Sequence, residues 1–169
     1  MICIICTKNK HVRYVECDRN WWRYKKVNCR HYKGEPGGGH SLVREFSGRG
    51  HSPFHPDHNS SYLYTRGSLY AATVADFSAT DSLIIKNQLR TEQYDYMHLN
   101  SPDFVGSLED DEHVYFFFRE AAVEFMNCGK AVYSRVARVC KNDEGGSHKF
   151  ANRSTSIIER YPHPESEKP

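Results

Sequence analysis

The chain has 169 residues, of which 26% are charged, and its formal net charge is +2. This composition is typical of a soluble globular protein, and so small a charge predicts neither nucleic acid nor a membrane surface as a partner. The sequence has no apolar stretch near the roughly 20 residues that a membrane-spanning helix needs. The apolar run at 1–6 is also too short for a secretory signal peptide and lacks basic residues before it.

Residues 1–40 differ in composition from the rest and form a divergent N-terminal segment. Aromatic and basic residues alternate irregularly through 20–26, which favours a strand with long solvated side chains over a nucleic-acid contact. The glycine-rich stretch 34–39 indicates a loop or hairpin tip and not a domain linker. Cys3 and Cys6 form a CxxC pair, but nothing nearby completes a zinc site, so an irregular terminus is the preferred interpretation.

From Ser41 onward, short β-favouring runs alternate with turn residues. Residues 41–46 predict a strand that ends at the glycines of 48–50. Residues 62–74 predict a hairpin with Arg66 and Gly67 in its turn. Residues 82–85 predict another short strand.

The strongest strand signal is the aromatic run 114–118, which suits a strand covered on both faces. A short strand is predicted at 122–126, and a long outer strand at 131–140. Only 91–100 is expected to hold a helical turn. These patterns predict an all-β fold, for which a sandwich, a barrel and a propeller remain open.

Several ordered blocks of sequence resemble the sema domain of semaphorins. The blocks are ATVADFS at 72–78, LRTEQYD at 89–95, LNSPDFV at 99–105, VYFFFRE at 114–120 and CGKAVYSRVARVCKND at 128–143. DHNS at 57–60 is similar to a further family segment. Several long matches in the same order are more specific than one short motif. The similarity is greater to invertebrate-type or transmembrane semaphorins than to the secreted vertebrate group.

The resemblance implies a partial β-propeller, namely two to three blades of a seven-bladed sema domain. Residues 41–151 would form the partial sema domain, and 152–169 an irregular C-terminal tail. We expect a chain truncated at both ends, because the family pattern breaks off on either side. An incomplete stack leaves sheet faces and edges uncovered, which predicts marginal stability and association.

The resemblance also implies an extracellular or cell-surface ligand that binds a plexin receptor and acts in axon guidance and cell migration. We expect no catalytic activity, cofactor, metal or small-molecule substrate. A homodimer of the full-length parent would bring receptors together by multivalency.

Two other interpretations remain open. His51, His55 and His58 lie within eight residues and suit zinc by ligand type, which would fit a metal-dependent hydrolase. Two prolines in this stretch restrict convergence of the side chains, so a surface loop is preferred. A non-functional truncated fragment is the other interpretation. The acidic group 109–112 lacks the alternating ligands of a calcium loop and indicates a solvated turn.

The receptor-binding site is predicted at 94–100, a segment between two groups of strands that is rich in residue types common at interfaces. The candidate residues are Tyr94, Tyr96, Met97, His98, Leu99 and Asn100. In the alternative, Leu99 and Tyr94 face the core and fix the loop.

The family resemblance implies a disulfide between Cys17 and Cys29, where the family's first short-loop disulfide falls. It also implies that Cys140 pairs, in other members, with a cysteine beyond the end of this chain, so we expect it to be free here. The pairing of Cys128 is left open. Two sequons in predicted loops make Asn59 and Asn152 candidate glycosylation sites. Ser52 stands where many members have a cysteine.

Overall fold

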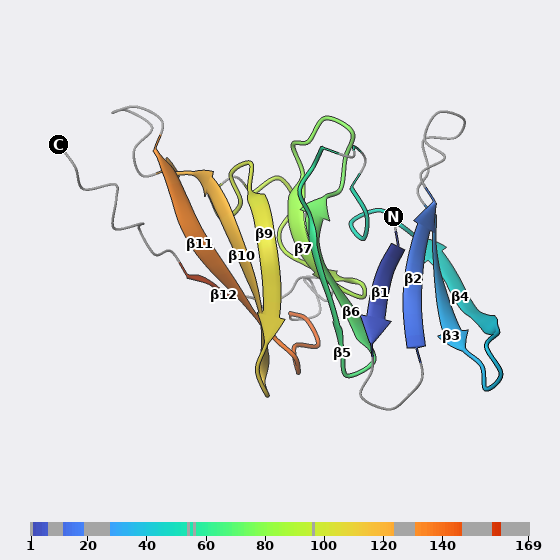
Figure 1. Cartoon of the computed structure of the whole chain (residues 1–169). Coiled ribbons are helices and arrows are strands. Elements are labelled where there is room, and N and C mark those ends of the chain that lie inside the picture. The colour runs from blue at the N-terminus through green and yellow to red at the C-terminus, as the bar shows by residue number, and fades with distance from the viewer. Residues whose placement is uncertain are drawn as a thin grey trace.

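The computed structural model is all-β, with three antiparallel sheets of four strands each (Figure 1). It describes residues 2–6, 12–18, 28–53, 55, 57–95, 97–123, 131–146 and 157–159, with the backbone alone described for 2–6, 12–14, 18 and 157–159. Each sheet uses four strands that are consecutive in the chain.

The strands follow in chain order through the three sheets. The first sheet contains β1 (Ile2–Cys6), β2 (Val12–Asp18), β3 (Asn28–Gly34) and β4 (His40–Ser47). The second contains β5 (Ser61–Thr65), β6 (Ser68–Val74), β7 (Ser82–Lys86) and β8 (Leu89–Arg90). The third contains β9 (Asp103–Glu109), β10 (His113–Ala121), β11 (Val132–Cys140) and β12 (Ile157–Glu159).

The predicted hairpin at 62–74 is confirmed as β5 and β6. Thr65 and Ser68 face each other, and the two residues between them, Arg66 and Gly67, have φ values of 48° and 80°. Two successive positive φ values are typical of a type I′ turn, whose twist matches that of the flanking strands. The glycine-rich stretch 34–39 likewise forms the tip of the β3–β4 hairpin, as predicted.

The main hydrophobic core lies between the second and third sheets. Val114, Phe116 and Phe118 of β10 point into it, beside buried residues of β6, β7, β9 and β11. Burial of each large apolar side chain stabilises the fold by roughly 1.5–3 kcal/mol. The prediction that this strand is covered on both faces is wrong for the described residues, because Phe117, on the opposite face, is 37% exposed.

Smaller apolar clusters join the first and second sheets. Val15, Cys17 and Cys29 pack with Leu69 of β6. The loop after β4 covers Leu83 and Ile85 of β7, and a Cβ on Gly50 would lie 3.3 Å from Cδ2 of Leu83. Gly50 also has a φ of 76°, so this close approach needs a glycine.

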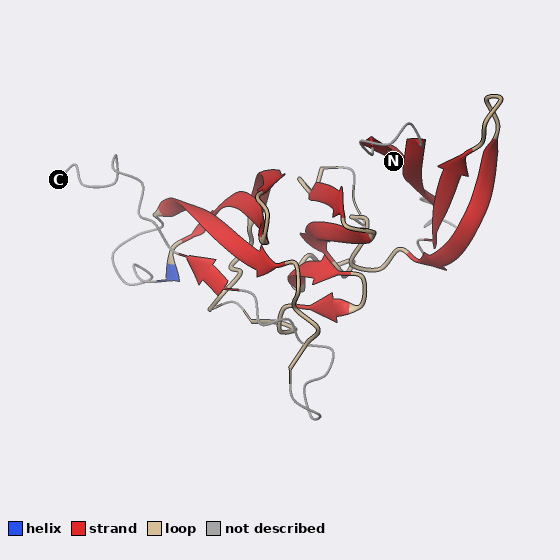
Figure 2. Cartoon of the chain, turned by 90° about the horizontal axis from the view of Figure 1, so that it is seen from below, coloured by secondary structure: helices blue, strands red, loops and turns tan. Residues whose placement is uncertain are grey.

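The first strands of successive sheets lie side by side, with β5 in contact with both β1 and β9. The hydroxyl of Ser107 donates a hydrogen bond of 3.1 Å to the carbonyl of Tyr62 across the β5–β9 boundary. Figure 2 shows the sheets following one another along the molecule. Radial repetition of four-stranded sheets is the geometry of a β-propeller. The predicted all-β partial propeller is therefore confirmed, with three blades.

A half-buried lysine ties the second sheet to the third. The Nζ atom of Lys86, at the end of β7, donates hydrogen bonds of 2.7 and 2.6 Å to the carbonyls of Lys141 and Asp143, just after β11. Hydrogen bonds from a charged donor are stronger than neutral ones. The two blades are thus joined by polar contacts as well as by the apolar core.

Several predictions about the strands need correction. β11 is not an outer strand, because the order of its sheet is β12-β11-β10-β9. The tail from 152 was expected to be irregular, but Ile157–Glu159 forms β12 on the free edge of β11. The stretch 91–100 forms turns, and the bond from the Leu99 amide to the Asp95 carbonyl, four residues earlier, is that of a single helical turn, as predicted.

Six strands were not predicted: β1, β2, β3, β8, β9 and β12. β2 and β3 combine apolar residues with long charged or polar ones, whereas β1 is part of the apolar run at 1–6, which was interpreted as an irregular terminus. β9 contains Gly106 and Ser107, which weaken a strand signal. The segment 20–26 and most of 122–130 lie outside the described residues. Within the described part of the chain, no helix is long and apolar enough to cross a membrane.

Candidate functional site

The predicted segment at 94–100 connects β8 of the second sheet to β9 of the third, and Asp95 organises it. The Oδ1 atom of Asp95 accepts a 3.0 Å hydrogen bond from the Met97 amide, and its carbonyl accepts one of 3.0 Å from the Leu99 amide. Its Oδ2 atom lies 2.5 Å from Nδ1 of His98. A side-chain oxygen that binds the backbone two residues on defines an Asx turn.

Three of the predicted residues project from this turn into solvent. Tyr94 is 55% exposed and Met97 is 50% exposed, and His98 is exposed as well. Aromatic residues and methionine are enriched at protein interfaces. Tyr96 lies outside the described residues.

Leu99 and Asn100 hold the segment in place. Leu99 is 6% exposed and belongs to the main core. The Asn100 amide donates a 2.8 Å hydrogen bond to Oε2 of Glu120. The Nδ2 atom of Asn100 donates a 3.0 Å hydrogen bond to the carbonyl of Ala121. Leu99 therefore fits the alternative in which it faces the core, whereas Tyr94 does not.

Glu120 is itself held by an arginine inside the third sheet. Its Oε1 atom lies 2.6 Å from Nε of Arg135, and both side chains are almost fully buried. Buried carboxylates need such partners, because an uncompensated charge is costly in the interior. The far end of the candidate segment is thus fastened to an internal ion pair.

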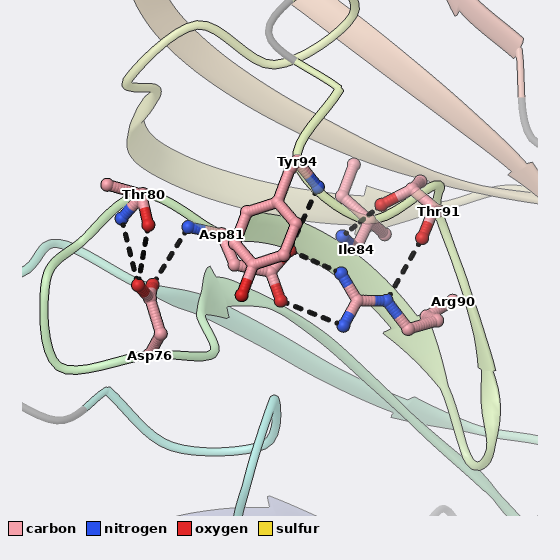
Figure 3. Close-up of polar contacts among 7 residues, drawn as sticks. All are labelled: Asp76, Thr80, Asp81, Ile84, Arg90, Thr91 and Tyr94. Atoms are coloured by element: carbon pink, nitrogen blue, oxygen red, sulfur yellow. Dashed lines mark hydrogen bonds and ion pairs between the residues drawn. The ribbon is translucent and has the colours of Figure 1, made fainter.

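The near end of the segment is fastened by Asp81, which precedes β7 (Figure 3). The carboxylate of Asp81 is fully buried and accepts hydrogen bonds of 3.0 and 2.6 Å from Nη1 and Nη2 of Arg90. Its Oδ1 atom also accepts a 3.4 Å bond from the Tyr94 amide. Tyr94 has a φ of 56°, which is uncommon for a bulky residue, so this bond helps to fix a strained backbone.

Asp76 fixes the neighbouring β6–β7 turn. Its carboxylate accepts hydrogen bonds from the Thr80 hydroxyl, the Asp81 amide and the Ser78 hydroxyl. Partial burial opposes ionisation, but these donors outweigh it and lower the pKa of Asp76 to about 2. Sequence reasoning missed Asp76, Asp81 and Arg90, although the clustered Asp, Ser and Thr of 76–81 are typical of side-chain-capped turns.

The three histidines of the alternative metal site do not form one. Nδ1 of His51 lies 3.4 Å from the Arg49 carbonyl, its ring packs edge-on against Phe46, and burial lowers its pKa. His55 lies at the surface, and its Nδ1 atom is 3.3 Å from Oδ2 of Asp57. Among the described residues, no group of three or more His, Cys, Asp or Glu could hold a metal ion.

The acidic group 109–112 serves structural roles. Oδ1 of Asp110 accepts hydrogen bonds of 2.7 and 2.6 Å from the amides of Glu112 and His113, and Oδ2 accepts one of 2.7 Å from the Tyr115 hydroxyl. These bonds, chiefly the one from Tyr115, lower the pKa of Asp110 to about 2. Glu109 pairs with Lys141 at 2.5 Å. The arrangement closes the β9–β10 turn.

Cys17 and Cys29 form a disulfide between β2 and β3, where they are direct cross-strand partners with a Cα–Cα distance of 4.1 Å. In the described part of the chain the thiol of Cys140 is free. Cys128 lies outside that part, as do the side chains of Cys3 and Cys6. Asn59 is exposed in the loop before β5, and the second sequon asparagine, Asn152, is not among the described residues.

Comparison with known proteins gives consistent matches. Semaphorin-1A of Schistocerca americana is 53% identical over 146 residues, which are 86% of this chain and 20% of that protein. Semaphorin-6D of Homo sapiens is 45% identical over 136 residues, 78% of this chain and 12% of that protein. The chain thus spans a fifth or less of these relatives. No protein-family model matches it.

Solved structures agree with the sequence relatives. Drosophila Semaphorin 1b, extracellular domains 1-2, matches with a TM-score of 0.78 and 44% identity over 96% of this chain and 32% of that chain. The structure of Drosophila Plexin A in complex with Semaphorin 1b matches with a TM-score of 0.76 and 47% identity, covering 93% of this chain and 29% of that chain. The blocks noted in the sequence, the three-bladed fold and these matches lead to one conclusion: the chain belongs to the semaphorin family and matches part of its sema-domain propeller.

Proposed function

We propose that this chain is part of an extracellular or cell-surface semaphorin ligand that binds a plexin receptor and has no catalytic activity. The observation that carries the proposal is its similarity to the structure of Drosophila Plexin A in complex with Semaphorin 1b. The downstream roles that we propose are axon guidance and cell migration. Two ligand copies in a homodimer would bring two receptors together by multivalency.

The contact surface that we propose consists of Tyr94, Met97 and His98, together with Tyr96. The Asx turn at Asp95 and the bonds to Asp81 and Glu120 hold this segment at both ends. A surface already held in one conformation loses little conformational entropy when it binds, which favours affinity. The exposed residues then act as contacts and the buried Leu99 as their support.

Alanine substitution distinguishes residues that contact the receptor from residues that only support the segment. We expect Met97→Ala and His98→Ala each to weaken binding to a plexin ectodomain by about 1 kcal/mol or more, roughly fivefold in Kd, without lowering the melting temperature. Surface plasmon resonance and thermal unfolding of the same samples provide the measurement.

Val43→Ala is the matched control, because Val43 lies in the first sheet and is 52% exposed, against 50% for Met97. The control should leave both affinity and melting temperature unchanged. Failure of the unsubstituted chain to bind any plexin ectodomain would contradict the receptor assignment. Unchanged affinity in both alanine variants would instead move the contact surface away from this segment.

A further inference from the structure

The turn between β6 and β7 carries the most exposed large apolar side chain among the described residues. Phe77 is 71% exposed, against 65% for Val105, which is next in order. Single exposed apolar residues are common on protein surfaces, so exposure alone assigns no role to this ring. Two further features of Phe77 point to binding: the rigidity of the turn that carries it, and its place beside the candidate receptor segment.

The turn that carries Phe77 is held in one conformation by Asp76. The carboxylate of Asp76 accepts hydrogen bonds of 2.7 Å from the Thr80 hydroxyl and 2.8 Å from the Asp81 amide. It also accepts bonds from the Ser78 hydroxyl and the Thr80 amide. A backbone that is already fixed loses little conformational entropy when a partner binds. Phe77 is therefore displayed on a rigid support.

The same turn is connected to the candidate segment through Asp81 (Figure 3). The Asp81 amide donates to Oδ1 of Asp76, and Oδ1 of Asp81 accepts a 3.4 Å bond from the Tyr94 amide. These bonds form a continuous chain from one loop to the other, at the end of the second sheet where β7 begins. Tyr94 and Met97 are 55% and 50% exposed on the second loop. Two adjoining, connected loops thus present Phe77, Tyr94 and Met97.

We propose that Phe77 is an apolar anchor of the plexin contact, so that the receptor-binding surface extends from the candidate segment to the β6–β7 turn. Its role depends on the function proposed above, because the partner is the same plexin receptor. Aromatic residues and methionine are enriched at protein interfaces, and a few well-packed side chains supply most of the binding energy. The receptor surface that fits is an apolar pocket, since the ring of Phe77 has no hydrogen-bonding group.

The contact is tested by substitution of Phe77 in the full chain. We expect Phe77→Ala to raise the Kd for a plexin ectodomain about tenfold without lowering the melting temperature, and Phe77→Tyr, which keeps the ring, to stay within about twofold. Leu42→Ala is the matched control, because Leu42 is 54% exposed on β4, and should leave the Kd unchanged. Affinity is the readout because the amides of Thr80 and Asp81 are already bonded to Asp76 in the free chain, where hydrogen exchange is slow.

The support from Asp76 is tested by a double-mutant cycle. Asp76→Asn should raise the Kd about threefold, because the loosened turn has to be ordered again in the complex. The same substitution in the Phe77→Ala chain should change the Kd by less than about 1.5-fold, since no contact from the turn remains to be positioned. Equal effects of Asp76→Asn in both chains would overturn its role in positioning Phe77.

Two outcomes would overturn the contact role of Phe77 while the receptor assignment stands. One is unchanged affinity of Phe77→Ala, and the other is a loss of affinity that only follows a loss of thermal stability. Absence of binding by the unsubstituted chain would contradict the receptor assignment itself, and the role of Phe77 with it. Surface plasmon resonance and thermal unfolding of the same samples distinguish these results.

Discussion

Asp81 joins the two loops at one end of the second sheet through its bonds to Arg90 and Tyr94. Because this carboxylate is fully buried, we expect Asp81→Asn to lower the free energy of unfolding by about 3 kcal/mol, since the Arg90 charge then loses its partner. Urea denaturation of the chain measures the change. Asp111→Asn, at an exposed position, is the control and should stay within about 0.5 kcal/mol of the unsubstituted chain. A loss below about 1 kcal/mol for Asp81→Asn would contradict this role for the ion pair.

Ser52 differs from Asp81, because its buried polar side chain makes no hydrogen bond among the described residues. Its side chain is fully buried, and its Oγ atom has no hydrogen-bond partner among the described residues. An unsatisfied buried hydroxyl costs about 1–3 kcal/mol, so Ser52→Ala should raise the free energy of unfolding by about 1 kcal/mol.

The matched control for Ser52 is Ser60→Ala. The Ser60 hydroxyl is bonded to Thr73 at 2.7 Å, and its removal should cost about 1 kcal/mol. Equilibrium unfolding of both variants gives the comparison. Destabilisation by Ser52→Ala equal to that of Ser60→Ala would show that the Ser52 hydroxyl has a partner in solution.

The β6–β7 turn is expected to make stability depend on pH through Asp76. Its pKa is lowered from 3.8 to about 2 in the folded chain, so its contribution is complete above pH 3.8 and is lost as the pH falls toward 2. In Asp76→Asn this contribution is absent at every pH. The difference in unfolding free energy between the two chains should therefore shrink from pH 5 to pH 2. A constant difference over that range would contradict the role assigned to the ionised carboxylate.

The β2–β3 hairpin is closed by the disulfide between Cys17 and Cys29, which are 12 residues apart. A cross-link of this span contributes about 3 kcal/mol by restricting the unfolded chain. The double substitution Cys17→Ala, Cys29→Ala should lower the free energy of unfolding by about that amount. Cys140→Ala is the control, because its thiol is free. Equal stabilities of the double variant and the control would contradict the structural role of the disulfide.

Elements with strong local signals were predictable from sequence, and those set by distant partners were not. The β5–β6 hairpin was found because Arg66-Gly67 suits its turn, and β10 because of its aromatic run. The place of β11 inside its sheet depends on β12, seventeen or more residues further along the chain, and no local pattern shows that pairing. The sequence also could not show which residues of the candidate segment are exposed. Leu99 is buried and Tyr94 is not, and this difference arises only when the third sheet is in place.

The residues that hold that segment in place could not be predicted from the sequence either. Asp81 and Arg90 lie nine residues apart on β-rich sequence, and Asn100 and Glu120 twenty residues apart. Such pairs meet only when the strands beside them pair within a sheet, β7 with β8 and β9 with β10. The resemblance to a family indicated the segment, and the structure identifies the residues that hold it in place.

At the scale of the whole molecule, the outward face of the third sheet carries exposed apolar side chains among its polar ones. Leu108, Phe117 and Val132 are exposed on it, on the side of β10 and β11 away from the main core. Exposed apolar patches of this kind favour association. We expect the purified chain to associate reversibly, and Phe117→Lys with Val132→Lys to shift it toward monomer in sedimentation velocity.

Leu42→Lys with Val43→Lys, on β4 of the first sheet, is the control for association. These two side chains are also about half exposed, and their substitution should leave the distribution closer to that of the unsubstituted chain. Equal effects of the two pairs would show that association does not depend on the third sheet.

The receptor-binding account is tested most directly by hydrogen exchange of the chain with and without a plexin ectodomain. Amides in 92–100 should exchange more slowly in the complex, since binding would cover the turn that Asp95 organises. Amides at the tip of the β3–β4 hairpin, 34–40, should exchange at the same rate in both samples. Protection of 92–100 alone is the predicted result, and a complex that leaves this segment unprotected would contradict the account.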